Sequence, residues 1–129
     1  MEIGFEGLPV KKVYYKGQVP KISNGYFKIS NKSEQLMAIS VLDVHVSDGE
    51  KKIPINDFFL YKLPEYIALD PKKINLERKE VLQLDLSFPF ISDAGLQKNK
   101  IKVYLTLKVN DDTIQSSSLV ELDFRVPKE

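Results

Sequence analysis

The fold is indicated most clearly by residues 100–126, which read KIKVYLTLKVNDDTIQSSSLVELDFRV. From Ile101 to Val109 apolar and polar side chains alternate, the period of two expected of a β-strand with one buried face. A turn-rich break follows at Asn110 to Asp112, and alternation resumes from Val120 to Val126. Two strands cannot bury an apolar face by themselves, so we expect the preceding chain to supply an opposing layer.

Further strand patterns precede this hairpin. Residues 25–30 and 81–88 alternate cleanly, and in the second of these Leu82, Leu84, Leu86 and Phe88 are expected inward and Gln83, Asp85 and Ser87 outward. Residues 10–16 and 51–55 lie at or near prolines, which restrict a strand to a sheet edge. We therefore expect short edge strands at both of these places.

The longest strand pattern of the first half, Leu36 to Ser47, changes phase. One face carries Met37, Ile39 and Val41, and the other carries Leu42, Val44 and Val46. A change of phase within one strand predicts a β-bulge, or a strand that leaves one sheet and enters another.

The whole pattern is typical of a β-sandwich. We count seven to nine strands with turn signals between them, and no segment with a credible helical period. The nearest helical candidate, residues 91–98, is short and contains Gly95. We predict that residues 1–129 form one all-β domain, an antiparallel β-sandwich.

Two stretches carry a resemblance to a known family. Residues 27–41 contain a strand that ends in Asn-x-Ser and is followed by an apolar strand, and residues 69–76, LDPKKINL, lead into the strand pattern 81–88. Together they cover about a third of the chain, and they resemble the immunoglobulin-like sandwiches of the major-sperm-protein and flagellar-protein type. The resemblance implies an immunoglobulin-like fold and a non-enzymatic interaction domain.

Composition excludes several classes of function. The 19 basic and 18 acidic residues give a net charge of +1, so the basic excess of most nucleic-acid-binding proteins is missing. The absence of cysteine removes disulfides, thiolate nucleophiles and thiolate metal sites. We see neither a signal peptide nor an apolar run long enough for a membrane helix. We therefore expect a cytoplasmic protein that binds neither nucleic acid nor membrane.

No arrangement of residues predicts catalysis, a metal site or a cofactor. His45, the only histidine, lies between Asp43 and Ser47 on one face of a strand, and we interpret this as a polar outer face. The aspartates at turns lack the spacing of a calcium motif and suit hairpin geometry. Asn31-Lys32-Ser33 matches an N-glycosylation acceptor sequence, but we interpret it as an ordinary turn. We therefore predict no enzyme activity and no cofactor.

The most distinctive segment is FFLYKLPEY, residues 58–66. Aromatic loops on a rigid sandwich often contact partners, because rings offer a large area with few torsions to order. We expect Phe58 and Leu60 to belong to the core. The predicted partner-binding residues are Phe59, Tyr61 and Tyr66, with a second surface at Lys102 and Tyr104 on the C-terminal hairpin.

Three classes of function remain open. The first is a protein-interaction or structural module that uses the aromatic loop 58–66 or a sheet edge, where a partner or a second copy could add a strand. The second is a carbohydrate-binding module in which tyrosines stack on sugar rings, the candidates being Tyr14, Tyr15, Tyr26, Tyr61 and Tyr66. The third is a protease inhibitor that inserts one loop end of the sandwich into an active site.

Overall fold

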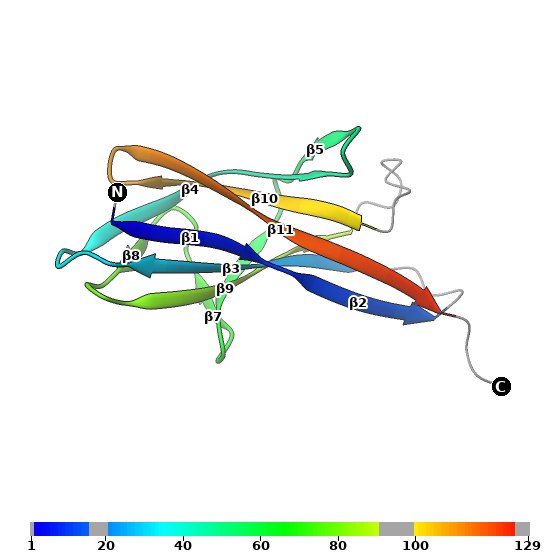
Figure 1. The fold of residues 1–129 in the computed structure, drawn as a ribbon, viewed down its shortest axis with the longest axis horizontal. Coiled ribbons are helices and arrows are strands. Elements are labelled where there is room, and N and C mark those ends of the chain that lie inside the picture. Colours follow the sequence, from blue (N-terminus) through cyan, green and yellow to red (C-terminus); the bar gives the residue numbers. More distant parts are fainter. Residues whose placement is uncertain (1, 16–20, 91–99, 126–129) are drawn as a thin grey trace.

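A computed structural model describes residues 2–15, 21–90 and 100–125. These residues form eleven strands and no helix, and the strands make two sheets that face one another (Figure 1). The strands are β1 (Ile3–Leu8), β2 (Val10–Tyr15), β3 (Ile22–Asn31), β4 (Met37–Ser47), β5 (Lys52–Pro54), β6 (Phe59–Lys62), β7 (Ile67–Leu69), β8 (Ile74–Leu76), β9 (Val81–Pro89), β10 (Lys100–Val109) and β11 (Asp112–Arg125).

The first sheet, sheet A, has the order β1-β3-β9-β6-β7, and the second, sheet B, has the order β2-β11-β10-β4-β5. The short strand β8 also belongs to sheet B and pairs with the start of β4. The predicted edge strands are confirmed, because β2 and β5 lie at the two ends of sheet B. The arrangement is an immunoglobulin-like β-sandwich, which confirms the predicted fold class.

The hairpin of β10 and β11 supplies the core of sheet B. Its two arms pair antiparallel from Lys100 opposite Glu121 to Val109 opposite Asp112. All five side chains that were expected inward on β10 are buried, namely Ile101, Val103, Leu105, Leu107 and Val109. On β11, Val120 and Leu122 are buried as well, whereas the Phe124 side chain and Val126 lie outside the described residues.

The predicted phase change in β4 is a β-bulge. The register with β10 shifts between Thr106 and Leu107, which face Asp43 and Val41, so Leu42 is the extra residue. Leu42 is therefore exposed to solvent, whereas Val44 and Val46 are buried in the same core as Met37 and Ile39. The sequence pattern had placed these two pairs of residues on opposite faces. The bulge lets all of β4 contribute to one buried face.

The first two strands are divided between the sheets. β1 pairs antiparallel with β3, and after Pro9 the chain crosses to sheet B, where β2 pairs parallel with β11. Figure 1 shows β2 running beside the red strand β11. Buried Ser118 on β11 links the two sheets where the chain crosses. Its Oγ donates to the Leu8 carbonyl at 2.6 Å and accepts from the Tyr26 amide at 3.1 Å. A Cβ on Gly7 would lie 1.6 Å from the Ser117 carbonyl oxygen, so only glycine fits there.

The structure differs from the sequence prediction in two respects. The described residues contain eleven strands rather than seven to nine, because β1 and β6 were not expected as strands. The sandwich is also not wholly antiparallel, since β2 and β11 run parallel. The helical candidate at 91–98 lies outside the described residues.

Candidate functional site

A buried carboxylate lies on the outer face of sheet A. Asp85 occupies an outward position of β9, as the alternation predicted, yet it is only 4% exposed. The Asn24 Nδ2 group, from the neighbouring strand β3, donates to Asp85 Oδ1 at 3.2 Å, and the Ser87 hydroxyl donates to the same oxygen at 3.2 Å. Sequence alternation found the direction of Asp85 but not its burial, which depends on strands that are distant in sequence.

Three tyrosines surround this carboxylate. Tyr26 on β3 and Tyr61 on β6 are the two register partners of Asp85, so their side chains flank it on both sides. Tyr66, just before β7, lies with its ring centroid 6.3 Å from that of Tyr61. We refer to Tyr26, Tyr61 and Tyr66 as the tyrosine cluster.

Tyr66 is the most exposed ring of the tyrosine cluster. Its side chain is 58% exposed, and its backbone has the left-handed φ of 59°. Negative charge on Tyr26 and on Asp85, with a smaller contribution from burial, raises the pKa of Tyr66 above its ordinary value.

Within the described residues, one polar atom near Asp85 has no partner. Asn24 is 5% exposed, and its Oδ1 accepts no hydrogen bond although its Nδ2 is bonded to Asp85. Buried polar atoms are nearly always hydrogen-bonded in native proteins, so an exception needs an explanation such as an ordered water, an ion or a ligand. The cluster thus combines exposed rings, a buried carboxylate and an unsatisfied acceptor.

The predicted partner-binding residues are divided between the two faces of the sandwich. Phe59, Tyr61 and Tyr66 form one row on sheet A, with the Phe59 and Tyr61 ring centroids 6.4 Å apart. Lys102 and Tyr104 lie on β10 in sheet B, so the structure does not bring the two groups together. As expected for core residues, Leu60 is buried and Phe58 packs partly buried against the core.

The region around His45 is less polar than the sequence suggested. The His45 ring stacks on Tyr104, its neighbour across the strand pair, with centroids 4.6 Å apart and planes 11° apart. Its Nδ1 lies 2.7 Å from Asp43 Oδ2. His45 is therefore buried, at 7% exposed, on a face where we expected a polar exposed histidine.

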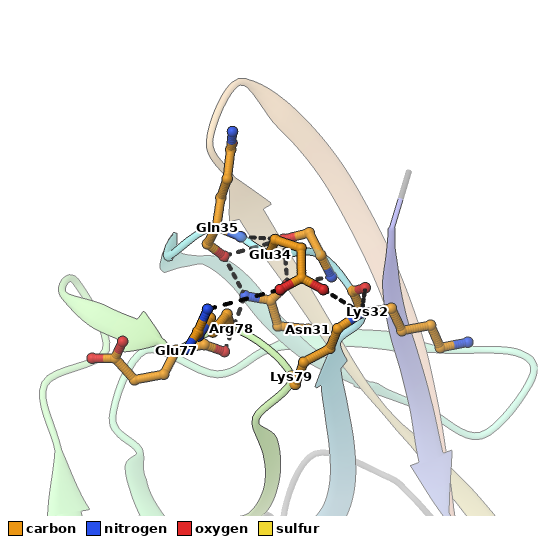
Figure 2. Close-up of polar contacts among 8 residues, drawn as sticks. Asn31, Lys32, Glu34, Gln35, Glu77, Arg78 and Lys79 are labelled. Carbon is orange, nitrogen blue, oxygen red and sulfur yellow. Dashed lines mark hydrogen bonds and ion pairs between the residues drawn. The ribbon is translucent and has the colours of Figure 1, made fainter.

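A second buried asparagine, Asn31, organises the opposite end of β3 (Figure 2). Its Nδ2 donates to the carbonyls of Gln35, Leu76 and Glu77 at 2.7, 3.1 and 3.1 Å. Its Oδ1 accepts from the amide and the hydroxyl of Ser33 at 2.9 and 2.7 Å. Asn31 is 1% exposed and is the last residue of β3, and the chain bends directly after it, at Ser33 to Gln35.

Charged side chains lie over this turn. The Lys79 ammonium donates to the Lys32 carbonyl at 2.8 Å and lies 3.1 Å from Glu34 Oε1 (Figure 2). Arg78 approaches the other carboxylate oxygen of Glu34 at 4.0 Å. All of these side chains are well exposed, so their ion pairs contribute little to stability. The hydrogen bonds of Asn31 are therefore the main connection between the end of β3 and the segment at Leu76 and Glu77.

The described residues contain neither a cluster of metal ligands nor a membrane-spanning helix. In residues 2–15, 21–90 and 100–125, no three histidine, aspartate or glutamate side chains gather as metal ligands. Nor does this described part of the chain contain a helix with the length and apolarity to cross a membrane.

Comparison with known proteins supports the fold. No family model matches the sequence, and no curated protein matches it. Among solved structures, the chain is similar to a FixG-related protein from Vibrio parahaemolyticus, with TM-score 0.55, 19% identity, and 95% of this chain and 97% of that chain covered. It is also similar to part of a family 123 glycoside hydrolase from Clostridium perfringens, with TM-score 0.60, 8% identity and coverage of 99% and 28%.

A third structure, the PapD-like domain 7 of human CEP192, gives TM-score 0.49 and 8% identity over 99% of this chain and 87% of that one. At identities this low, the likenesses to the Vibrio and Clostridium proteins show the fold alone. The narrower resemblance to major-sperm-protein domains stays a prediction.

Proposed function

We propose that this chain is a non-enzymatic protein-interaction module that binds its partner through the aromatic row of Phe59, Tyr61 and Tyr66. The observation that carries the proposal is the exposure of neighbouring rings on the sandwich surface, with Phe59 59% and Tyr66 58% exposed. Exposed aromatic side chains that lie next to one another are enriched in protein interfaces, where each buries a large area.

The placement of the row supports a protein partner. Phe59 and Tyr61 stand on β6, whose neighbour β7 is the last strand of sheet A. Ala68, which faces Tyr61 across the pair of β6 and β7, is exposed and continues the face of the rings to that edge. A partner that covers the rings can therefore also pair with the free backbone edge of β7, the strand-addition mode of recognition.

The proposal is tested by comparing the partner affinities of two surface variants with that of the wild-type chain. Proteins captured by the wild-type chain are identified, and the affinity of each purified partner is measured for wild type, for Tyr61→Ser with Tyr66→Asn, and for Lys102→Ser with Tyr104→Ser. Asparagine is chosen at position 66 because it tolerates a left-handed φ. The second variant changes the other predicted surface, on sheet B.

Two results are informative. We expect the sheet A variant to weaken binding at least about tenfold, since interface rings typically contribute more than 1 kcal/mol each, and the sheet B variant to leave the affinity unchanged. Loss of binding only in the sheet B variant would contradict the proposed surface. Both variants are first compared with wild type by thermal unfolding, since a folded control is needed for either conclusion.

A carbohydrate-binding module is the second candidate, and one observation favours it. The tyrosine cluster stands beside Asp85 and Asn24, and hydrogen-bonding groups next to aromatic rings are what a sugar site combines. The Clostridium structure concerns glycolipid glycan hydrolysis, although that likeness is one of fold. Retention on polysaccharides in native gels, lost in the sheet A variant, would favour this function over the first.

A further inference from the structure

The charge of Asp85 is left without a counter-ion. Among the described residues, its carboxylate receives only the neutral donors Asn24 and Ser87, and both hydrogen bonds end on Oδ1. No lysine or arginine of this part of the chain forms an ion pair with it. A carboxylate that is 4% exposed loses much of its hydration, and a buried charge is normally paired. A cation from outside the described chain would fill this gap.

The donor groups of that cation can be inferred from the neighbouring amide. Asn24 Oδ1 is a buried acceptor without a hydrogen bond, and the same amide contacts Asp85 through Nδ2. The Asp85 carboxylate and Asn24 Oδ1, on adjacent strands, are therefore two neighbouring acceptors that can take further hydrogen bonds from one ligand. A quaternary ammonium ion has no N–H group and would leave Asn24 Oδ1 unpaired, whereas a guanidinium carries five N–H donors in a planar fork.

The aromatic surroundings favour the same group. Tyr26 and Tyr61 flank Asp85 from the two neighbouring strands, and Tyr66 extends the cluster toward solvent. A guanidinium stacks on tyrosine faces while it bonds a carboxylate in its own plane, which an ammonium cannot do. Tyr66 is the ring most free to move aside, because it is the most exposed of the three and precedes a strand of three residues.

We propose that Asp85, Asn24 and the tyrosine cluster form a binding site for a guanidinium group, supplied by an arginine side chain of the partner protein. The proposal rests on the proposed function and deepens it, since the arginine would insert beside the aromatic row of Phe59, Tyr61 and Tyr66. Charge-assisted hydrogen bonds in a site with little water are stronger than neutral ones, so this arginine would be a hot spot of the interface.

The test uses small probes and therefore needs no knowledge of the partner. Ethylguanidinium chloride is titrated into the isotopically labelled full chain, and the amide signals of β3, β6 and β9 and the Asn24 side chain are followed by NMR. N-ethylurea serves as the neutral isostere and methylammonium chloride as the compact cation. We expect ethylguanidinium to saturate at roughly millimolar concentration, at least about tenfold below either control probe.

Two variants locate the binding. Asp85→Asn removes the charge and keeps the shape, and we expect it to abolish the preference for ethylguanidinium over N-ethylurea. Tyr66→Asn removes an exposed ring without disturbing the left-handed backbone, and we expect at least about threefold weaker binding. Asp123→Asn on β11 is the matched control and should bind as wild type does. Tyr66→Asn decides the matter if Asp85→Asn fails to fold.

The proposal is overturned if ethylguanidinium and N-ethylurea bind equally, if methylammonium binds as tightly, or if Tyr66→Asn binds like wild type. Its failure can be told from failure of the proposed function. A partner whose binding is lost in the Tyr61→Ser, Tyr66→Asn variant but unchanged in Asp85→Asn would keep the interaction module and reject the arginine site.

Discussion

Asn31 and Asn24 lie on the same strand, β3, and both are buried, yet their side chains are used differently. The Asn31 side chain makes five hydrogen-bond contacts: its two N–H groups are shared among three carbonyls and its Oδ1 accepts from two groups, so both ends of its amide are satisfied. Asn24 makes one, to Asp85, and its Oδ1 has no partner in the part of the chain that the structure describes. The surroundings differ too: Asn31 binds backbone carbonyls and Ser33, whereas Asn24 binds a charged side chain beside exposed rings.

The difference separates a structural network from a candidate binding site. A polar group whose hydrogen bonds are all made within the chain stabilises one conformation and has nothing left to offer a ligand. A buried group with an unused acceptor raises the free energy of the unbound protein, and a ligand that supplies the donor recovers it. On this view Asn31 holds the end of the sandwich together, and Asn24 belongs to the site around Asp85.

The largest effect is expected at Asn31. Asn31→Ala removes these hydrogen bonds and leaves the buried Leu76 carbonyl and the buried Ser33 amide without their partner, so we expect the free energy of unfolding to fall by roughly 3 kcal/mol. Urea unfolding measures it, with Asn75→Ala, an exposed asparagine on β8, as control. A loss no larger than that of the control would contradict the structural role of Asn31.

A smaller loss is expected at the residue that supports Asn31. Ser33→Ala removes a hydroxyl whose single hydrogen is shared between Asn31 Oδ1 and the Gln35 carbonyl and whose oxygen accepts from the Gln35 amide, and we expect the free energy of unfolding to fall by about 1 kcal/mol. The double variant with Asn31→Ala should lose less than the sum of the two single losses, because the side chains share one hydrogen bond. Strict additivity would show that the two act independently.

Replacing Asn24 should lower the free energy of unfolding less than replacing Asn31, although the two residues are similarly buried. Asn24→Ala removes the hydrogen bond to Asp85 and also removes the unpaired Oδ1, two changes of opposite sign. We therefore expect a loss of less than about 1 kcal/mol in urea unfolding. A loss as large as that of Asn31→Ala would break the comparison and make Asn24 a structural residue.

The smallest effect is expected in the exposed charges over the Asn31 turn. Lys79→Ala removes the contacts to the Lys32 carbonyl and Glu34, both near the surface, and should change the free energy of unfolding by less than about 0.5 kcal/mol. The electrostatic part should vanish in concentrated salt, so unfolding is compared at low and high ionic strength. A larger, salt-independent loss would mean that the Lys79 hydrogen bond belongs to the Asn31 network.

Local patterns in the sequence predicted much of the fold. Period-two alternation identified β9 and β10 with their correct faces, and the phase change before Val44 identified the bulge in β4. β1 was missed because Gly4 and Gly7 interrupt its apolar pattern, although Gly7 is required where the strand crosses β11. The parallel pairing of β2 and β11 was also missed, since it joins residues more than a hundred positions apart.

The candidate site was only partly predictable, because it too depends on pairing between strands that are distant in the sequence. The segment 58–66 is unusually aromatic, and that local signal led to Phe59, Tyr61 and Tyr66. Asp85 gave no such signal, because an aspartate at an outward strand position normally faces water. Its burial depends on which strands flank β9, and this pairing brings Tyr26 and Tyr61 to its two sides from positions 59 and 24 residues away.

The parallel pairing of β2 with β11 has a mechanical consequence. A force that pulls Val10 toward the N-terminus and Arg125 toward the C-terminus acts along both strands in opposite directions. In a parallel pair this loads the inter-strand hydrogen bonds in shear, so they resist together, whereas antiparallel hairpin strands pulled from their free ends open one bond at a time. The crossing of the chain at Pro9 thus places a shear-resistant clamp between the first and last strands of sheet B.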